Sequence, residues 1–173
     1  MPREIEFSRL TLQDALDLAI LIEDEAEERY LELAEQMETY DTPNAGRFFR
    51  FMADNEKKHG DSLRARRQAL FGGRPAAVDR DMLFDVEAPG YDRARAFMSA
   101  RQALEVALES EIKAHDFFDG ALPYIQDPEV RSLFQELRSE EIDHQERVKR
   151  ELSKQPQDDG LDPEEFVDEP PSL

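Results

Sequence analysis

The sequence predicts an all-α fold: a bundle of four long helices, made of two repeated helical hairpins that a long crossover joins. Three observations lead to this prediction. The chain of 173 residues is 39% hydrophobic and 36% charged with only 7 glycines, a composition that suits amphipathic helices. Four stretches are bounded by helix start and stop signals. The first two stretches match the last two, as the halves of an internal repeat do.

The first hairpin has recognisable ends. Its first helix begins at Thr11, an N-cap with Asp14 three residues later in a variant of the capping box. Its second helix begins at Thr42, with Pro43 at the first helical position, and stops at Gly72. The inward face of the first helix has the spacing of three and four residues, and it consists of Leu12, Leu16, Ala19, Glu23, Ala26, Tyr30 and Leu33.

The second hairpin repeats the first. Its helices begin near Ser99 and at Asp127, and they end before Pro123 and Pro156. A shift of 88 residues aligns the first helix with the third, and a shift of 85 aligns the second with the fourth. The polar residues that match are Glu23 with Glu111, Glu56 with Glu141, and His59 with His144.

The segment between the hairpins, residues 72–91, is long enough to run the length of a bundle at roughly 3.3 Å per residue. Ferritin-like topologies use a long crossover of this kind. We therefore expect one ferritin-like domain over residues 8–153. Residues 154–173 form a tail with seven acidic residues and no Lys or Arg after Lys154, which we expect to be disordered.

Composition excludes several classes of protein. The net charge of −19 argues against a nucleic-acid partner, because phosphates would be repelled. No apolar run approaches the roughly 20 residues of a membrane span, and the start lacks the apolar core of a signal peptide. The absence of Cys excludes disulfides, zinc–thiolate sites and a rubredoxin-type iron centre in these residues. We expect a cytoplasmic protein that binds neither nucleic acid nor membrane.

The matched polar residues are expected to lie at one height in the bundle. Glu23 lies 17 residues before Tyr40, and His59 lies 17 residues after Thr42, each about 25 Å of helix from the turn. The second hairpin has a closely similar spacing. Six side chains should therefore converge at mid-bundle: Glu23, Glu56, His59, Glu111, Glu141 and His144.

Four carboxylates buried together would repel one another unless cations compensate their charge. Carboxylate oxygen and imidazole nitrogen suit Fe or Mn, and this ligand set is that of di-iron and di-manganese carboxylate bundles. We predict that all six residues bind metal, with two Fe ions per bundle and Mn as the alternative. The four glutamates, Glu23, Glu56, Glu111 and Glu141, are also the predicted catalytic residues.

Three neighbouring residues have simpler interpretations. His115 is interpreted as a solvated or structural residue and Tyr30 as a core aromatic, although either could join the site. Glu140 is interpreted most simply as part of a solvated face; it lies one turn from His144 and is the best substitute ligand if Glu141 does not bind metal.

Four segments of the sequence resemble the erythrin domain of the rubrerythrin family over about residues 8–153. They are Glu23-Asp-Glu-Ala-Glu-Glu-Arg-Tyr30, Asp54-Asn-Glu-Lys-Lys-His59, Glu111-Ile-Lys-Ala-His-Asp-Phe-Phe118 and Glu140-Glu-Ile-Asp-His144. The resemblance implies a non-haem di-iron oxidoreductase that reduces peroxide or dioxygen, or oxidises Fe(II), in protection against oxidative stress. It also implies roles: Glu23 and Glu111 as terminal carboxylates, Glu56 and Glu141 as bridging ones, and one imidazole per iron from His59 and His144.

The chain departs from the family pattern in two ways. Typical rubrerythrins add a cysteine-bearing rubredoxin domain, so turnover here would need an external electron donor. They also carry an extra carboxylate one turn after the ligand on the third helix, where this chain has Ala114 and His115. The second departure favours an iron-binding or ferroxidase role in iron storage or homeostasis as the alternative function.

Two further functions stay open, since one fold supports many reactions. One is a ferritin-like oxygenase that acts on an organic substrate, and the other is a metal-free helical interaction module, which the buried acids disfavour. We also expect a homodimer, because a crossover of this length permits exchange of hairpins between chains.

Overall fold

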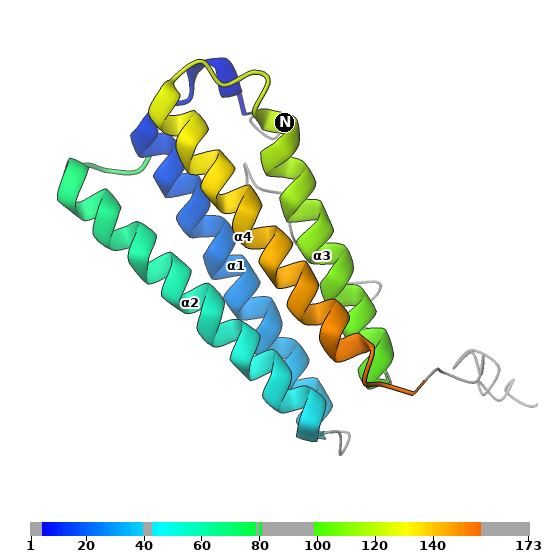
Figure 1. Cartoon of the computed structure of the whole chain (residues 1–173). Helices are drawn as coiled ribbons and strands as arrows, with labels where there is room; N and C mark the ends of the chain where they lie inside the picture. The colour runs from blue at the N-terminus through cyan, green and yellow to red at the C-terminus, as the bar shows by residue number, and fades with distance from the viewer. Residues whose placement is uncertain (1–4, 40–42, 79, 81–98, 157–173) are drawn as a thin grey trace, which may run out of the picture.

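The computed structural model describes residues 5–39, 43–78, 80 and 99–156. This part of the chain contains a short 3₁₀-helix, η1 (Phe7–Arg9), and no strand. Its four long helices are α1 (Leu12–Thr39), α2 (Pro43–Phe71), α3 (Ala100–Ala121) and α4 (Pro128–Leu152), which run side by side (Figure 1). The predicted all-α fold is therefore confirmed.

The helices pack as two hairpins. The contacts between α1 and α2 and between α3 and α4 are extensive, whereas fewer contacts join α1 to α3 and α4. This arrangement agrees with the ferritin-like bundle that the repeat predicts (Figure 1). Thr42, most of the expected crossover and the tail from residue 157 lie outside the described residues, so those predictions and the domain bounds remain untested.

Equivalent caps begin α1 and α3. The Thr11 hydroxyl accepts a hydrogen bond from the backbone N–H of Asp14, whose carboxylate in turn accepts from Thr11. At α3, the Ser99 hydroxyl and the Gln102 side chain satisfy each other's backbone N–H groups in a full capping box. The first turns of these two matched helices are thus stabilised by the same local interaction.

The ends of α2 and α4 also follow from local sequence. Asp127 caps α4 by accepting hydrogen bonds from the N–H groups of Glu129 and Val130, and Pro128 occupies the first turn. Gly72 ends α2 with a φ of 57°, a left-handed conformation that favours glycine. The partly buried side chain of Arg67 holds this end in place, because it pairs with Asp17 of α1 at 2.7 Å and donates to the Gly72 carbonyl.

Two apolar clusters form the core, and they occupy opposite ends of the bundle. The first cluster joins the start of α1 and the end of α2 to the turn between α3 and α4; its largest side chains include Leu16, Ile22, Phe118, Leu133 and Phe134. The second joins the end of α1 and the start of α2 to the start of α3, and it includes Tyr30, Met37, Phe49, Met52 and Leu104. The core is therefore apolar at both ends of the bundle, and buried polar residues lie between the two clusters.

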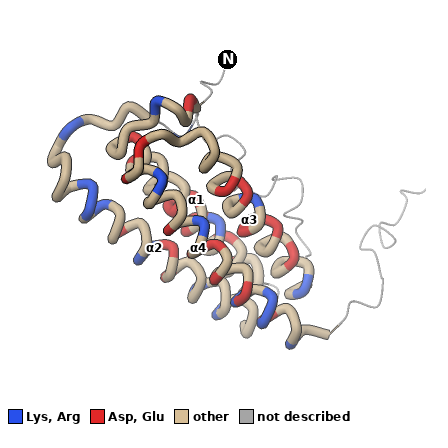
Figure 2. Tube along the Cα trace, turned by 45° about the horizontal axis from the view of Figure 1, so that its top comes forward, with Lys and Arg blue, Asp and Glu red and all other residues tan. Residues whose placement is uncertain are grey.

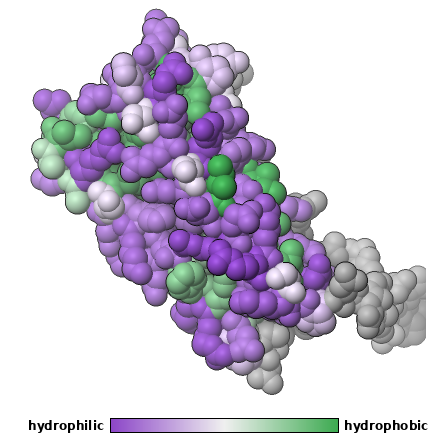
Figure 3. All heavy atoms as spheres, viewed as in Figure 1, coloured by the Kyte–Doolittle hydropathy of each residue, from purple (hydrophilic) through white to green (hydrophobic). Residues whose placement is uncertain are grey.

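The surface of the bundle is mostly polar. Both signs of charge are spread along the helices (Figure 2), and apolar side chains appear as separate patches on the face shown in Figure 3. Among the described helices, none has the length and apolar character needed to cross a membrane.

Replacing Asp127 with Ala should lower the free energy of unfolding by about 1 kcal/mol, because two N–H groups of the first turn of α4 lose their acceptor. Urea denaturation of the metal-free protein, followed by circular dichroism, measures this change. Asp127→Asn is the matched control, since it keeps a side-chain oxygen and should cost only a few tenths of a kcal/mol. Equal losses in the two variants would contradict this account of the cap.

Candidate metal centre

A polar layer separates the two apolar clusters, and it contains all six residues that the repeat places at mid-bundle. Each helix contributes to the layer: α1 and α3 supply one glutamate each, whereas α2 and α4 supply a glutamate and a histidine each. Five of the six residues are buried, each exposed by 5% or less; these are Glu23, Glu56, Glu111, Glu141 and His144. The exception is His59, whose side chain is 28% exposed.

Three carboxylates surround the imidazole of His144. Its Nδ1 atom lies 3.2 Å from Oε2 of Glu111, 3.3 Å from Oε1 of Glu56 and 3.7 Å from Oε2 of Glu141. These carboxylates come from three different helices. The atoms of Glu111, Glu141 and His144 are close enough to hold one cation.

The imidazole of His59 has a different set of neighbours. Its Nδ1 atom lies 3.9 Å from Oε2 of Glu23, 4.0 Å from Oε2 of Glu56 and 3.9 Å from Oε2 of Glu140. The sequence places Glu140 one turn from His144, yet its carboxylate lies beside His59. A second possible cation position is therefore formed by Glu23, His59 and Glu140.

Glu56 lies between the two halves of the site. Its two oxygens each approach a different imidazole, and the rings of His59 and His144 stack with centroids 5.2 Å apart and planes 8° from parallel. This position suits the bridging role that the family resemblance implies for Glu56. Glu141 and Glu111 approach the ring of His144, whereas Glu23 approaches that of His59.

The donor atoms of the layer test whether a metal fits. Among the described residues, five buried side-chain atoms lack a hydrogen bond, and four of them belong to predicted ligands: Glu56 Oε1, His59 Nδ1, Glu141 Oε2 and His144 Nε2. Buried polar atoms are normally hydrogen-bonded, so their concentration here needs a cause. Carboxylate oxygen and imidazole nitrogen are ligands for Fe and Mn, and bound cations would satisfy these atoms. The residues present thus fit a pair of metal ions.

Burial changes the acid–base properties of these groups. It raises the pKa of the Glu56 carboxyl to about 7, although nearby His144 opposes the rise. It also raises the pKa of Glu141 to about 8, and Glu111 contributes to that rise. The pKa of Glu140 is raised to about 7, mainly by burial and then by Glu136. These carboxyls therefore ionise less readily when no cation is present to compensate their negative charge.

The two imidazoles shift in opposite directions. Burial and the neighbouring His144 lower the pKa of His59 to about 4. For His144, burial acts to lower the pKa, but hydrogen bonds to Glu111 and Glu141 outweigh it and raise the pKa. His59 is thus the neutral imidazole, the form that binds metal directly.

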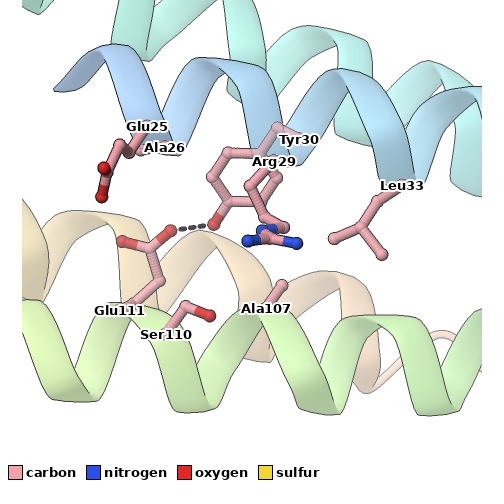
Figure 4. A pocket seen from close by; sticks show the side chains of 8 residues that line it. All are labelled: Glu25, Ala26, Arg29, Tyr30, Leu33, Ala107, Ser110 and Glu111. Carbon is pink, nitrogen blue, oxygen red and sulfur yellow. Dashed lines mark hydrogen bonds between the residues drawn. The ribbon is translucent and has the colours of Figure 1, made fainter. Parts of the chain in front are cut away.

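Tyr30 supports the layer from the second apolar cluster. Its ring is buried and stacks on Phe49 with centroids 6.1 Å apart, as expected of a core aromatic. Its hydroxyl, however, donates a hydrogen bond to Oε1 of Glu111 (Figure 4). The backbone carbonyl of Glu111 also accepts from the amide of Gln145, at 3.3 Å. Tyr30 therefore contacts a predicted ligand, a role that sequence reasoning left open.

A pocket between α1 and α3 leads to the same glutamate. Its walls are mainly apolar, with Tyr30 and Glu111 at one side (Figure 4), and its lining consists of Glu25, Ala26, Arg29, Tyr30, Leu33, Ala107, Ser110 and Glu111. Sequence reasoning missed this pocket. The small residues Ala26 and Ala107 on facing helices are the signal that could have indicated it.

The third-helix positions that depart from the family pattern do not contribute to the layer. Ala114 is fully buried. His115 is partly exposed and lies 3.0 Å from the carboxylate of Asp116, and it belongs to none of the cation-sized groups found among the described residues. This placement agrees with the interpretation of His115 as a structural or solvated residue.

A family model described as Rubrerythrin matches residues 14–152. Among solved structures, the chain is similar to an uncharacterized conserved protein from Magnetospirillum magnetotacticum MS-1. The two share 30% sequence identity with a TM-score of 0.70, and the match covers 86% of this chain and 98% of the other. No curated protein matches this chain.

Raising the pH from 6.5 to 8 should destabilise the metal-free protein. The folded pKa values of Glu56 and Glu141, about 7 and 8, lie above the usual value of 4.5 for a glutamate carboxyl. The folded state therefore binds more protons than the unfolded state in this interval, and stability falls as pH rises. His59 has the opposite effect, but mainly below pH 6.5. Thermal melts with a chelator at constant ionic strength should show a loss on the order of 1–2 kcal/mol.

Two comparisons accompany this measurement. The double variant Glu56→Gln/Glu141→Gln should lose part of the pH dependence, because neither amide titrates; Glu140 and His144, whose pKa values are also raised, account for the rest. With saturating Mn(II), the stability of the unmodified protein should rise with pH instead of falling, since metal binding requires deprotonated ligands. A double variant that keeps the full pH dependence would contradict the assignment to these carboxyls.

Proposed function

The chain belongs to the rubrerythrin family, and on that premise we propose that it is a non-haem di-iron oxidoreductase that reduces peroxide or dioxygen. One observation supports this function most: the six predicted ligands converge in one layer, and four of their buried donor atoms have no hydrogen bond. In this proposal the iron ions are held by Glu23, Glu56, His59, Glu111, Glu141 and His144.

Iron bound at this site would supply the electrons that reduce the oxidant. The protein's own residues set the conditions for that chemistry. Glu56 lies between the two imidazoles and holds the two halves of the site at a constant separation. The apolar clusters at both ends of the bundle shield the buried ligands from water, which strengthens the electrostatic interactions among them.

Tyr30 orients Glu111 in this proposal. Its hydroxyl donates to one carboxylate oxygen of Glu111, which leaves the other oxygen directed at His144, 3.2 Å away. The pocket beside Tyr30 is mainly apolar, so it suits a small neutral oxidant such as peroxide or dioxygen. We propose that the oxidant approaches Glu111 through this pocket.

Repeated turnover requires a source of electrons. The 173 residues contain no Cys, so they cannot form a rubredoxin-type iron centre. We propose an external electron donor, which would reduce the site after each reaction. Protection against oxidative stress is the corresponding physiological role.

A second candidate function is ferroxidase activity, in which Fe(II) is the substrate. The observation that favours it is the partial exposure of His59 and Glu140, 28% and 33%, which leaves one side of the layer open to ions from solution. The net charge of −19 would also attract Fe(II).

An anaerobic Fe(II) titration of the metal-free protein, followed by peroxide or air, tests both functions. Binding should saturate at about two Fe(II) per chain. Faster oxidation by peroxide than by air supports the peroxidase, whereas faster oxidation by air with release of Fe(III) supports the ferroxidase. An absence of Fe(II) binding would rule out both.

The variants Glu56→Ala and Glu141→Ala should consume oxidant at least about tenfold more slowly with Fe(II), because each loses a carboxylate of the site. Glu146→Ala is the control, since Glu146 lies on α4 with an exposed side chain that pairs with Lys149. Unchanged oxidant consumption in the first two variants would refute the proposed function.

A further inference from the structure

The internal repeat predicts two equivalent halves of the site, but the structure shows a difference between them. His144 of α4 approaches Glu56 of α2. The repeat pairs His144 with His59 and Glu56 with Glu141, so the equivalent contact would join His59 to Glu141. In the structure the carboxylate of α4 that lies beside His59 is that of Glu140, 3.9 Å from its Nδ1 atom.

Glu140 has no acidic counterpart in the other hairpin. The same shift of 85 residues that aligns the two Glu-x-x-His motifs aligns Glu140 with Asn55. The half of the site around His59 thus has a carboxylate at a position whose equivalent in the other half is an amide, that of Asn55. Glu140 lies outside the six ligands that the repeat supplies.

The geometry around His59 is that of a cation site. The ligand atoms of Glu23, His59 and Glu140 all lie within 4.8 Å of one another. A metal ion with bonds of about 2.1 Å requires separations of roughly 3 to 4.2 Å between its ligands, so small side-chain movements would suffice. The Nδ1 atom of His59 is itself buried without a hydrogen bond, and it lies 4.0 Å from Oε2 of Glu56, a residue that is 2% exposed.

This group is also the accessible side of the layer. The side chains of His59 and Glu140 are 28% and 33% exposed, whereas that of Glu23 is 6% exposed. An ion that enters from solution would meet His59 and Glu140 before the buried ligands.

We propose that Glu140 is a seventh metal-binding residue, which holds a divalent cation together with Glu23 and His59 on the solvent side of the site. The position at His59 is then the one through which cations enter and exchange, and the position at His144 is the enclosed one. This inference rests on the proposed function, because it requires that the layer binds two metal ions.

Titration of the metal-free full chain with Co(II), followed by its visible absorption, tests the proposal without any turnover. The unmodified protein should bind two Co(II). In Glu140→Gln the first ion should bind as before, and the second should bind at least about tenfold more weakly. The variant His59→Ala should weaken the binding of the same second Co(II). Adding Glu140→Gln to this variant should cause little further loss of affinity, because both residues bind the ion at one position.

Glu136→Gln is the matched control. Glu136 lies one turn earlier on α4, and its side chain is 56% exposed. The substitution therefore removes one negative charge from the same surface, as Glu140→Gln does. It should weaken the second Co(II) far less than Glu140→Gln does, because Glu136 supplies no ligand atom and acts on Glu140 only through its charge. The role of Glu140 would be overturned if Glu136→Gln lost as much Co(II) affinity as Glu140→Gln. It would also be overturned if both Co(II) affinities were unchanged in Glu140→Gln. Failure of the unmodified protein to bind Co(II) would instead overturn the proposed function itself.

Discussion

The structure depends on the burial of four carboxylates in the middle of an apolar bundle. Apolar clusters join the helices at both ends, and the carboxylates share the layer between them with two imidazoles and the hydroxyl of Tyr30. Without a cation, protons must compensate this charge, which is why burial raises the pKa of Glu56 and Glu141. A metal ion that replaces those protons contributes its binding free energy to the folded state. Fold and site are therefore one thermodynamic system.

The helices, their ends and the height of the site could be predicted from the sequence because each rests on local information. The caps at Thr11, Ser99 and Asp127 use hydrogen bonds within one helical turn. Residue counts from the turns place Glu23 and His59 at one level, since the rise per residue of a helix is constant. The repeat then supplied an independent check, because two hairpins showed the same spacing.

The neighbours of each ligand could not be predicted in the same way. Glu140 and Glu141 lie at almost the same height and differ by about 100° around the helix axis, so spacing alone does not tell which of them meets His59. That choice depends on how α4 is rotated against α2, which many side chains determine together. The contact between Tyr30 and Glu111 likewise depends on the distance between α1 and α3. A core aromatic and a residue that supports a ligand look alike in sequence.

The internal repeat has an evolutionary consequence. In a symmetric dimer of a single hairpin, one gene would encode both metal positions, and every mutation would alter them together. In a chain that carries both hairpins, each position can mutate alone, and the pair Asn55 and Glu140 is a place where the two copies have diverged. Duplication thus allows one ion to become exchangeable while its neighbour stays enclosed, a division of labour that strict symmetry would forbid.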